Sequence, residues 1–145
     1  MKVLVDTCVW SLALRRKNLT TLSGDEQRMV ASLREAIQDG RVAMIGPIRQ
    51  EVLSGIKDTA QFEKLRSALE AFPDEQLSTF HYEEAARLFN LCRSRGIECG
   101  PVDILICAVA AREHWTILTS DQGLKRCMDT LRTEELARQE ETPGS

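Results

Sequence analysis

The sequence predicts a three-layer α/β/α domain, in which helices cover both faces of a central parallel sheet of four or five strands. Two observations support this prediction. Short apolar runs rich in β-branched residues alternate along the chain with longer segments of helical periodicity, and residues 102–114 are apolar on nearly every side. Parallel strands need crossover helices between them, and a helix that is apolar all round belongs in the interior.

The chain of 145 residues is long enough for one domain with its own core. We expect residues 1–133 to form this domain and the charged residues 134–145 to form a frayed tail. The formal net charge of -3 excludes a generally basic nucleic-acid-binding surface. It permits a nuclease in which local basic groups surround an acidic site.

The expected location of the protein is the cytoplasm. No apolar stretch is long enough to span a bilayer, so no membrane contact is expected, and the first residues predict a strand rather than a signal sequence. The five cysteines are scattered, and no pair has the C-x-x-C spacing of a zinc or redox site. In a reducing cytoplasm we expect all five to be free thiols that pack as small apolar side chains.

The predicted elements follow one another without a linker or an internal repeat. Residues 3–5 form an apolar run too short for a helix, which predicts a strand buried on both faces. Gly46-Pro47 and Gly100-Pro101 mark two helix starts, because proline suits the first helical position. The expected strands are residues 3–5, 42–45 and 116–119, with further candidates at 76–80 and 130–133; helices begin near residues 9, 25, 47, 58, 82, 102 and 124.

Four acidic side chains stand out in these elements. Asp6 directly follows the first strand, Asp121 follows the strand at 116–119, Asp103 is the third residue of the apolar helix, and Glu51 lies beside apolar residues on the helix after residue 47. Each also has an ordinary interpretation. Asp6 and Asp121 would serve as helix N-caps, the helix dipole favours Asp103, and Glu51 would be a solvated edge residue.

The joint pattern favours a metal site. Three of the four acids fall at the carboxyl end of a strand or the amino end of a helix, which lie at the same edge of a parallel sheet. Carboxylates that converge there repel one another unless a cation lies between them. Hard oxygen ligands suit Mg²⁺ or Mn²⁺, and such ions support phosphodiester hydrolysis by activating water.

The segments around these acids resemble the PIN domain. Asp6 lies in LVDTCVW, Glu51 in RQEVLSG, Asp103 in PVDILICAVAA and Asp121 in ILTSDQGL. The length of the chain and its DT-x-x-W opening are similar to the ribonuclease toxins of VapBC toxin–antitoxin pairs. The resemblance covers residues 1 to about 132.

The resemblance implies a Mg²⁺-dependent endoribonuclease toxin, with Mn²⁺ able to substitute, that cuts structured RNA such as tRNA or rRNA. It also implies a homodimer and a VapB-like antitoxin that neutralises the enzyme. Asp6, Glu51, Asp103 and Asp121 would be catalytic residues and metal ligands, and Thr7 and Thr119 would assist them. Many relatives have a further Asp and a Phe where this chain has Gln-Gly-Leu after Asp121, so the number of ions and the direct binding of Asp121 stay open.

Other chemistries have less support. The two histidines lie at predicted helix ends away from any Ser or Cys motif, and Cys8 lacks a positive neighbour in its motif that would lower its pKa. The candidate RNA-binding residues are basic: Arg15, Arg16, Lys17, Arg93, Arg95, Lys125 and Arg126. The alternatives to a toxin are a non-catalytic PIN-like module, whose acids hold a structural cation or a basic partner segment, and a PIN nuclease that processes rRNA or acts on DNA.

Overall fold

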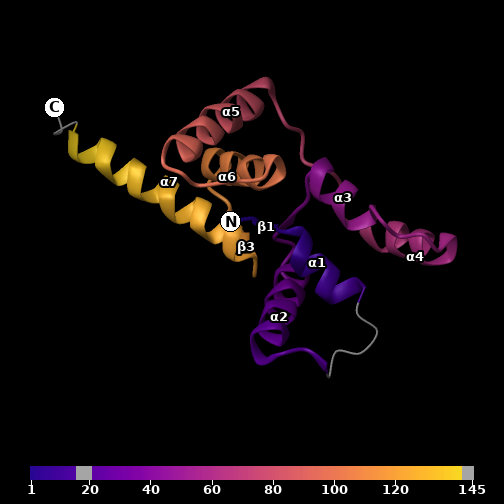
Figure 1. Ribbon diagram of the computed structural model, residues 1–145. Coiled ribbons are helices and arrows are strands. Elements are labelled where there is room, and N and C mark those ends of the chain that lie inside the picture. Colours follow the sequence, from indigo (N-terminus) through magenta and orange to yellow (C-terminus); the bar gives the residue numbers. More distant parts are fainter. Residues whose placement is uncertain (16–20, 142–145) are drawn as a thin grey trace.

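The computed structural model describes residues 1–15 and 21–141, which form seven helices and a small sheet (Figure 1). Within these residues, no helix is both long and apolar enough to cross a membrane. The elements are β1 (Val3–Val5), α1 (Thr7–Leu14), α2 (Gly24–Gln38), β2 (Val42–Ala43), α3 (Gly46–Leu53), α4 (Thr59–Leu69), α5 (Thr79–Ser94), α6 (Pro101–Glu113), β3 (Thr116–Leu118) and α7 (Gln122–Glu141).

The sheet has the strand order β2-β1-β3, and both pairings are parallel. Val3 pairs with Val42 on one side and with Thr116 on the other, so β1 is the central strand. An isolated parallel bridge between Met44 and Asp74 places a further extended segment beside β2. The strand predicted at 76–80 is not formed, because the pairing in this region lies at Asp74 and α5 begins before residue 80.

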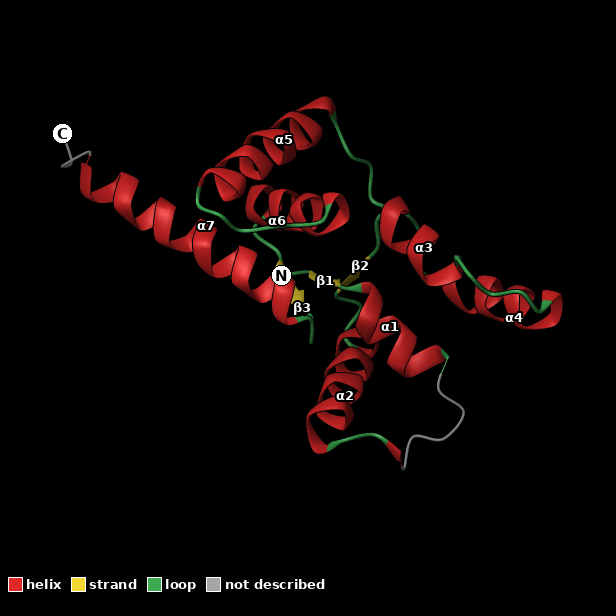
Figure 2. Ribbon diagram, in the orientation of Figure 1, coloured by secondary structure: helices red, strands yellow, loops and turns green. Residues whose placement is uncertain are grey.

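Helices lie on both sides of the sheet, as the sequence predicts. Figure 2 shows α5 and α6 on one side and α1 and α2 on the other. The interior of α6 is the centre of the core, since every residue from 104 to 110 is buried. Trp10 of α1 is also buried, and its ring centroid lies 5.0 Å from that of Phe72. The parallel α/β architecture is therefore confirmed.

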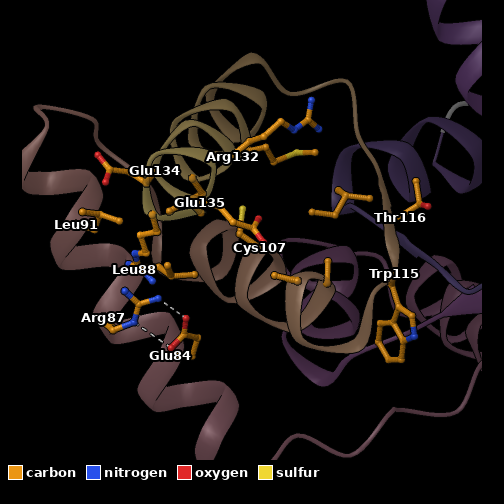
Figure 3. A pocket seen from close by; sticks show the side chains of 16 residues that line it. Glu84, Arg87, Leu88, Leu91, Cys107, Trp115, Thr116, Arg132, Glu134 and Glu135 are labelled. Carbon is orange, nitrogen blue, oxygen red and sulfur yellow. Dashed lines mark hydrogen bonds and ion pairs between the residues drawn. The ribbon is translucent and has the colours of Figure 1, made fainter. Parts of the chain in front are cut away.

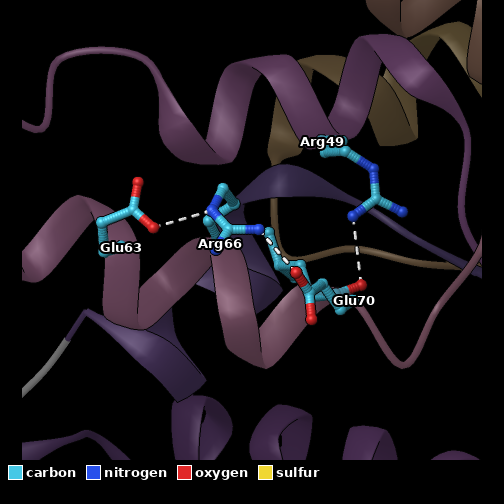
Figure 4. Close-up of polar contacts among 5 residues, drawn as sticks. Arg49, Glu63, Arg66 and Glu70 are labelled. Atoms are coloured by element: carbon cyan, nitrogen blue, oxygen red, sulfur yellow. Dashed lines mark hydrogen bonds and ion pairs between the residues drawn. The ribbon is translucent and has the colours of Figure 1, made fainter.

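Helix α3, which carries Glu51, is fixed to the end of α4 by the guanidinium of Arg49. This side chain donates hydrogen bonds to the carbonyl oxygen of Leu69 over 3.1 Å, to that of Phe72, and to Asp74 Oδ1 over 2.9 Å. Figure 4 shows the guanidinium beside the last turn of α4. Because Arg49 precedes Glu51 by two residues, these bonds fix the part of α3 from which Glu51 projects.

The C-terminal part of the described chain forms one long helix. The strand predicted at 130–133 is wrong, because α7 continues through it and across residue 133, where the sequence predicts the end of the folded domain. Leu124 and Cys127 are buried and Leu131 packs against the core. These residues recur at spacings of three and four, and this helical periodicity outweighs the β-branched threonines at 130 and 133.

Two cysteines form a disulfide, so the expectation of five free thiols is wrong for this pair. Cys99, just before α6, is bonded to Cys127 of α7, and their Cα atoms are 6.4 Å apart. Cys8, Cys92 and Cys107 are free. The bonded partners are 28 residues apart in the sequence, and the packing of α7 against α6 brings them together. Such a pair has no local spacing signature.

Candidate active site

Asp6 lies between the end of β1 and the start of α1 and is 5 % exposed. Its backbone N–H donates to the carbonyl oxygen of Leu118 over 2.9 Å, which continues the pairing of β1 with β3. Its Oδ1 accepts a hydrogen bond from the Thr7 N–H over 2.8 Å, so Asp6 is the N-cap of α1. Asp6 is therefore a helix cap, as one interpretation of the sequence predicts, but the capping hydrogen bond uses only one of its two carboxylate oxygens.

The other oxygen of Asp6 is held by Thr119, which joins two of the predicted acids. The buried hydroxyl of Thr119 donates to Asp6 Oδ2 over 2.8 Å and accepts from the Asp121 N–H over 3.0 Å. Asp121 Oδ2 in turn accepts from the Leu124 N–H over 3.0 Å, so Asp121 also caps a helix, α7. The Thr119 hydroxyl thus fixes Asp6 relative to the start of α7.

Glu51 approaches Asp6 from a different element. It lies on α3, and its side chain is exposed rather than packed along the apolar face of that helix. Its Oε1 accepts a hydrogen bond from the Thr7 hydroxyl over 3.3 Å. Because Thr7 directly follows Asp6, this contact places Glu51 beside the turn that carries Asp6.

Asp103 lies in the first turn of α6, after the N-cap Gly100, and is partly buried. The pKa of its carboxyl is raised from 3.8 to about 6, first by burial and then by the charges of Asp6, Asp121 and Glu51. A Cβ at Gly100 would lie 3.7 Å from Asp103 Oδ2, so this carboxylate lies close to the backbone of the turn. The other three predicted acids therefore all lie near enough to Asp103 for their charges to act on it.

Within the described residues, no ion pair offsets the charge of these four acids, which together form the acidic region. None of the four acids forms an ion pair with a described Lys, Arg or His. No three described His, Cys, Asp or Glu side chains approach closely enough, as they stand, to hold a metal ion. The donors are oxygen atoms, which suit a hard divalent ion, and such an ion would relieve the repulsion at Asp103. The four acids fit this ion in chemistry and charge, but they would have to close around it.

Cys8 and Ser120 extend the hydrogen-bond network, a role that the sequence alone does not reveal. Cys8 Sγ donates to Asp6 Oδ2 over 3.4 Å and accepts from Ser120 Oγ over 3.4 Å. It also lies 3.6 Å from Thr119 Oγ1. Each residue is close to an acid in the sequence, but only the pairing of β1 with β3 shows that the two segments meet.

Two of the predicted RNA-binding groups lie at helix ends. Arg15 is exposed at the end of α1, whereas residues 16 and 17 of the same basic run lie outside the described residues. Arg93 is exposed in the last turn of α5. Arg95 follows that helix and forms an ion pair with Glu134 of α7. Arg95 is therefore already engaged in an ion pair within the fold, which makes it less available for contact with RNA phosphates.

The third predicted basic group lies on α7 close to Asp121. Lys125 donates its backbone N–H to the carbonyl oxygen of Asp121 over 3.1 Å. A Cβ at Gly123 would lie 3.4 Å from Asp121 Oδ2 and 4.0 Å from the Arg126 guanidinium. The Arg126 guanidinium therefore lies near Asp121 on one side of the acidic region, and Lys125 lies in the first turn of the same helix.

A separate cavity of about 710 Å³ lies behind β3, between α5, α6 and α7 (Figure 3). Its lining includes the apolar residues Leu88, Cys107 and Met128, and none of the four acids contributes to it. Figure 3 shows Glu84 and Arg87 of α5 joined by hydrogen bonds in its wall. This cavity is distinct from the candidate active site.

Comparisons with known proteins agree with this architecture. A family model for the PIN domain matches residues 3–128. Among solved structures, the chain is similar to one described as the crystal structure of FitAcB from Neisseria gonorrhoeae, with a TM-score of 0.68 and 21% identity over 88% of this chain and 93% of that chain. At this identity the likeness shows the fold alone. No curated protein matches the chain.

The fold and the acidic region define the class of protein: a parallel α/β domain with carboxylates gathered where its central strand ends. Since the family model covers most of its length, the chain belongs to the PIN-domain family. PIN domains are generally nucleases, and those nucleases generally use divalent metal ions.

Proposed function

We propose that this protein is a metal-dependent endoribonuclease in which Asp6, Glu51, Asp103 and Asp121 hold Mg²⁺ or Mn²⁺. The observation that carries the proposal is the gathering of these carboxylates: hydrogen bonds through two threonines link Asp6 to Glu51 and to Asp121, and the charges of all three act on Asp103. Four acids that have no ion-pair partner repel one another, and this repulsion destabilises the folded protein unless a ligand of opposite charge binds. When bound, the ion would activate water and stabilise the charge that develops on the phosphate.

The remaining residues of the site would orient these acids. The Thr7 N–H and the Thr119 hydroxyl each bind one oxygen of Asp6, so both oxygens have fixed directions. Thr119 also binds the backbone of Asp121 and so couples the two acids. The Thr7 hydroxyl would hold Glu51 near Asp6 until the acids close around the ion. Partners of this kind are worth roughly 10- to 100-fold in metal affinity.

The proposed substrate is a structured RNA such as tRNA or rRNA. Its phosphates would contact Lys125 and Arg126 beside Asp121, together with Arg93 and the basic run at 15–17. Because Arg95 is paired with Glu134, we expect it to contribute less than Arg93.

The biological role that we propose is that of a VapC-type toxin in the cytoplasm. The DT-x-x-W opening and the four acidic motifs support this role. It implies a VapB-like antitoxin that covers the acidic region, and a homodimer of the toxin. An adjacent reading frame for a small protein with a DNA-binding N-terminus and a basic C-terminal tail would support the assignment.

The direct test is Asp6→Asn, which removes the charge but keeps an oxygen for the Thr7 N–H. We expect the variant to lose metal-dependent cleavage of total RNA and to lose growth arrest, with cleavage sites mapped after brief expression. Asp58→Asn is a matched control, because Asp58 caps α4 through the Ala60 N–H and lies outside the acidic network. Cleavage and arrest by Asp6→Asn at the wild-type level would overturn the mechanism.

A second candidate function is a non-catalytic module that binds RNA or a basic partner segment. One observation favours it: no three of the described acids, cysteines or histidines are close enough to hold an ion as they stand. This candidate predicts RNA binding without metal-dependent cleavage across a broad panel of RNAs. Cleavage of any member of that panel that stops with EDTA and returns with Mn²⁺ would exclude it.

A further inference from the structure

The disulfide joins the two segments that carry Asp103 and Asp121. Cys99 directly precedes Gly100, and the backbone of Gly100 lies close to the carboxylate of Asp103. Cys127 lies on α7, less than two turns after Asp121. The bond therefore ties the turn that carries Asp103 to the helix that Asp121 caps.

We propose that the Cys99–Cys127 pair is a redox switch of the candidate metal site. The disulfide holds Asp103 and Asp121 at a fixed spacing, and its reduction weakens the binding of the divalent ion. The switch rests on the metal-dependent function proposed above, because it regulates that same site. It assigns a role to two cysteines that do not touch the acids themselves.

Reduction would loosen α7 without releasing it. Leu124 is fully buried, and the Asp121 N–H remains bound to the Thr119 hydroxyl. The ion pair between Arg95 and Glu134 also joins the loop after α5 to α7. These contacts keep the helix in place, so the expected effect of reduction is a change in the spacing of acids and not unfolding.

The chemistry of the switch is thiol–disulfide exchange. A dithiol attacks the sulfur of Cys99, the less buried of two cysteines that both belong to the core. The S–S bond breaks, a mixed disulfide forms, and the second thiol of the reductant closes its own disulfide. Both cysteines end as thiols, and two electrons and two protons pass from the reductant to the protein. A small-molecule disulfide such as oxidised glutathione reverses the reaction.

The proposed cytoplasmic location is consistent with a bond that forms and breaks. Disulfides of reducing compartments are usually transient and serve catalysis or redox sensing. A purely structural bond would have little effect there, because it would be reduced for most of the time. The position beside two acids makes regulation of ion binding the expected consequence.

The experiment compares the full-length protein after oxidation with oxidised glutathione and after reduction with dithiothreitol, each reagent being removed anaerobically. Calorimetric titration with Mn²⁺ measures affinity, and hydrogen exchange measures opening of the backbone around residues 96–104 and 119–130. We expect reduction to weaken the affinity for Mn²⁺ about tenfold, as the loss of a supporting contact does in other metal sites. Exchange in both segments should become faster.

Variants separate the bond from other effects of the reagents. Cys99→Ser and Cys127→Ser should resemble the reduced protein under both conditions, and the double variant should add nothing further. Cys92→Ala removes a free thiol elsewhere in the core and should keep the full redox response. The wild-type comparison needs no substitution, so the test does not depend on the folding of any variant.

The outcomes distinguish the switch from the function on which it rests. If the wild-type protein binds Mn²⁺ equally well in both redox states, the switch is wrong, whatever the exchange rates, while the nuclease proposal stands. If neither state binds Mn²⁺ or cleaves RNA, the nuclease proposal is wrong and the switch falls with it. A tenfold difference that is absent in the double variant supports the switch.

Discussion

Two regions of the molecule that share α6 and α7 treat their acidic side chains differently. In the cavity behind β3, the Glu84 carboxylate is hydrogen-bonded to Arg87, which lowers the pKa of Glu84, and Glu134 is paired with Arg95. At the other end of α6, burial and the charges of three further carboxylates raise the pKa of Asp103 to about 6. Glu84 and Glu134 are therefore paired with arginines within the fold, whereas the four acids of the candidate active site are not.

This difference indicates which region requires a ligand. A paired surface acid contributes little to stability in either direction. Carboxylates that are gathered without a counter-charge cost stability, and folds retain such an arrangement where a function uses it. On this charge balance we propose the acidic region, and not the cavity behind β3, as the functional site.

The largest expected effect is on RNA cleavage. Asp103→Asn should lower the rate roughly 100-fold or more, a loss typical of a group that stabilises charge in a transition state. Glu84→Gln is the matched control, because it also neutralises an acid on the neighbouring helix and should leave cleavage unchanged. Initial rates on one defined RNA at saturating Mn²⁺ provide the measurement. Equal losses in the two variants would contradict the contrast between the two regions.

The second effect is on thermal stability. Ion binding to the folded protein at 100 times the dissociation constant adds about 2.7 kcal/mol, which corresponds to about 5 to 10 °C in Tm for a chain of this size. We expect Mn²⁺ to raise the Tm of the wild-type protein and of Glu84→Gln by this amount. Asp103→Asn should lose most of the shift. A Tm that does not respond to Mn²⁺ in any of these proteins would argue against a metal site.

The third effect concerns Thr119, which links Asp6 to Asp121. Thr119→Val keeps the shape of the side chain but removes the hydroxyl, so two hydrogen bonds are lost at a buried position. We expect a loss of about 1–3 kcal/mol in the free energy of unfolding and about a tenfold loss of cleavage. Urea denaturation measures the first quantity. Wild-type cleavage in a destabilised variant would show that Thr119 supports the fold and does not position the acids.

Local patterns in the sequence were sufficient to predict much of the fold. The apolar run at 3–5 predicts the central strand, and the all-round apolar character of 102–114 predicts the buried α6. The contexts of Asp6 and Asp121 predict the helix caps that both residues form. These features depend on residues that are neighbours in the chain, and for this reason they can be predicted from the sequence alone.

Features that depend on tertiary contacts were not predictable. The disulfide joins residues 28 positions apart, and the Cys8–Ser120 contact requires the register of β1 with β3. The strand predicted at 130–133 fails for the same reason, because packing of Leu131 against the core selects the helix. The proximity of the four acids is an intermediate case, since the rule for parallel sheets predicts a common edge for three of them, without Glu51, and predicts no distances.

The smallest effect is the pH dependence of stability in the absence of divalent ions. The Asp103 carboxyl has a pKa of about 6 in the folded protein, above the value of about 3.9 expected in the unfolded chain. Between these values the folded protein retains a proton that the unfolded chain has lost. The free energy of unfolding therefore falls as the pH rises from about 4 to about 6. Below this range the carboxyl is protonated in both states and causes no loss of stability. Solvent screening limits it to roughly 1 kcal/mol.

Glu84 should behave in the opposite way, which makes the pH series a sharp test of the comparison. Its pKa is lowered by the hydrogen bond to Arg87, so its contribution to stability is present above the pKa of the unfolded chain and disappears as the pH falls. Urea denaturation with EDTA between pH 3 and about pH 7 would give the free energy of unfolding for both variants. Relative to the wild type, Asp103→Asn should gain stability as the pH rises, and Glu84→Gln should lose it. Curves of the same sign would show that the two regions do not differ in charge balance.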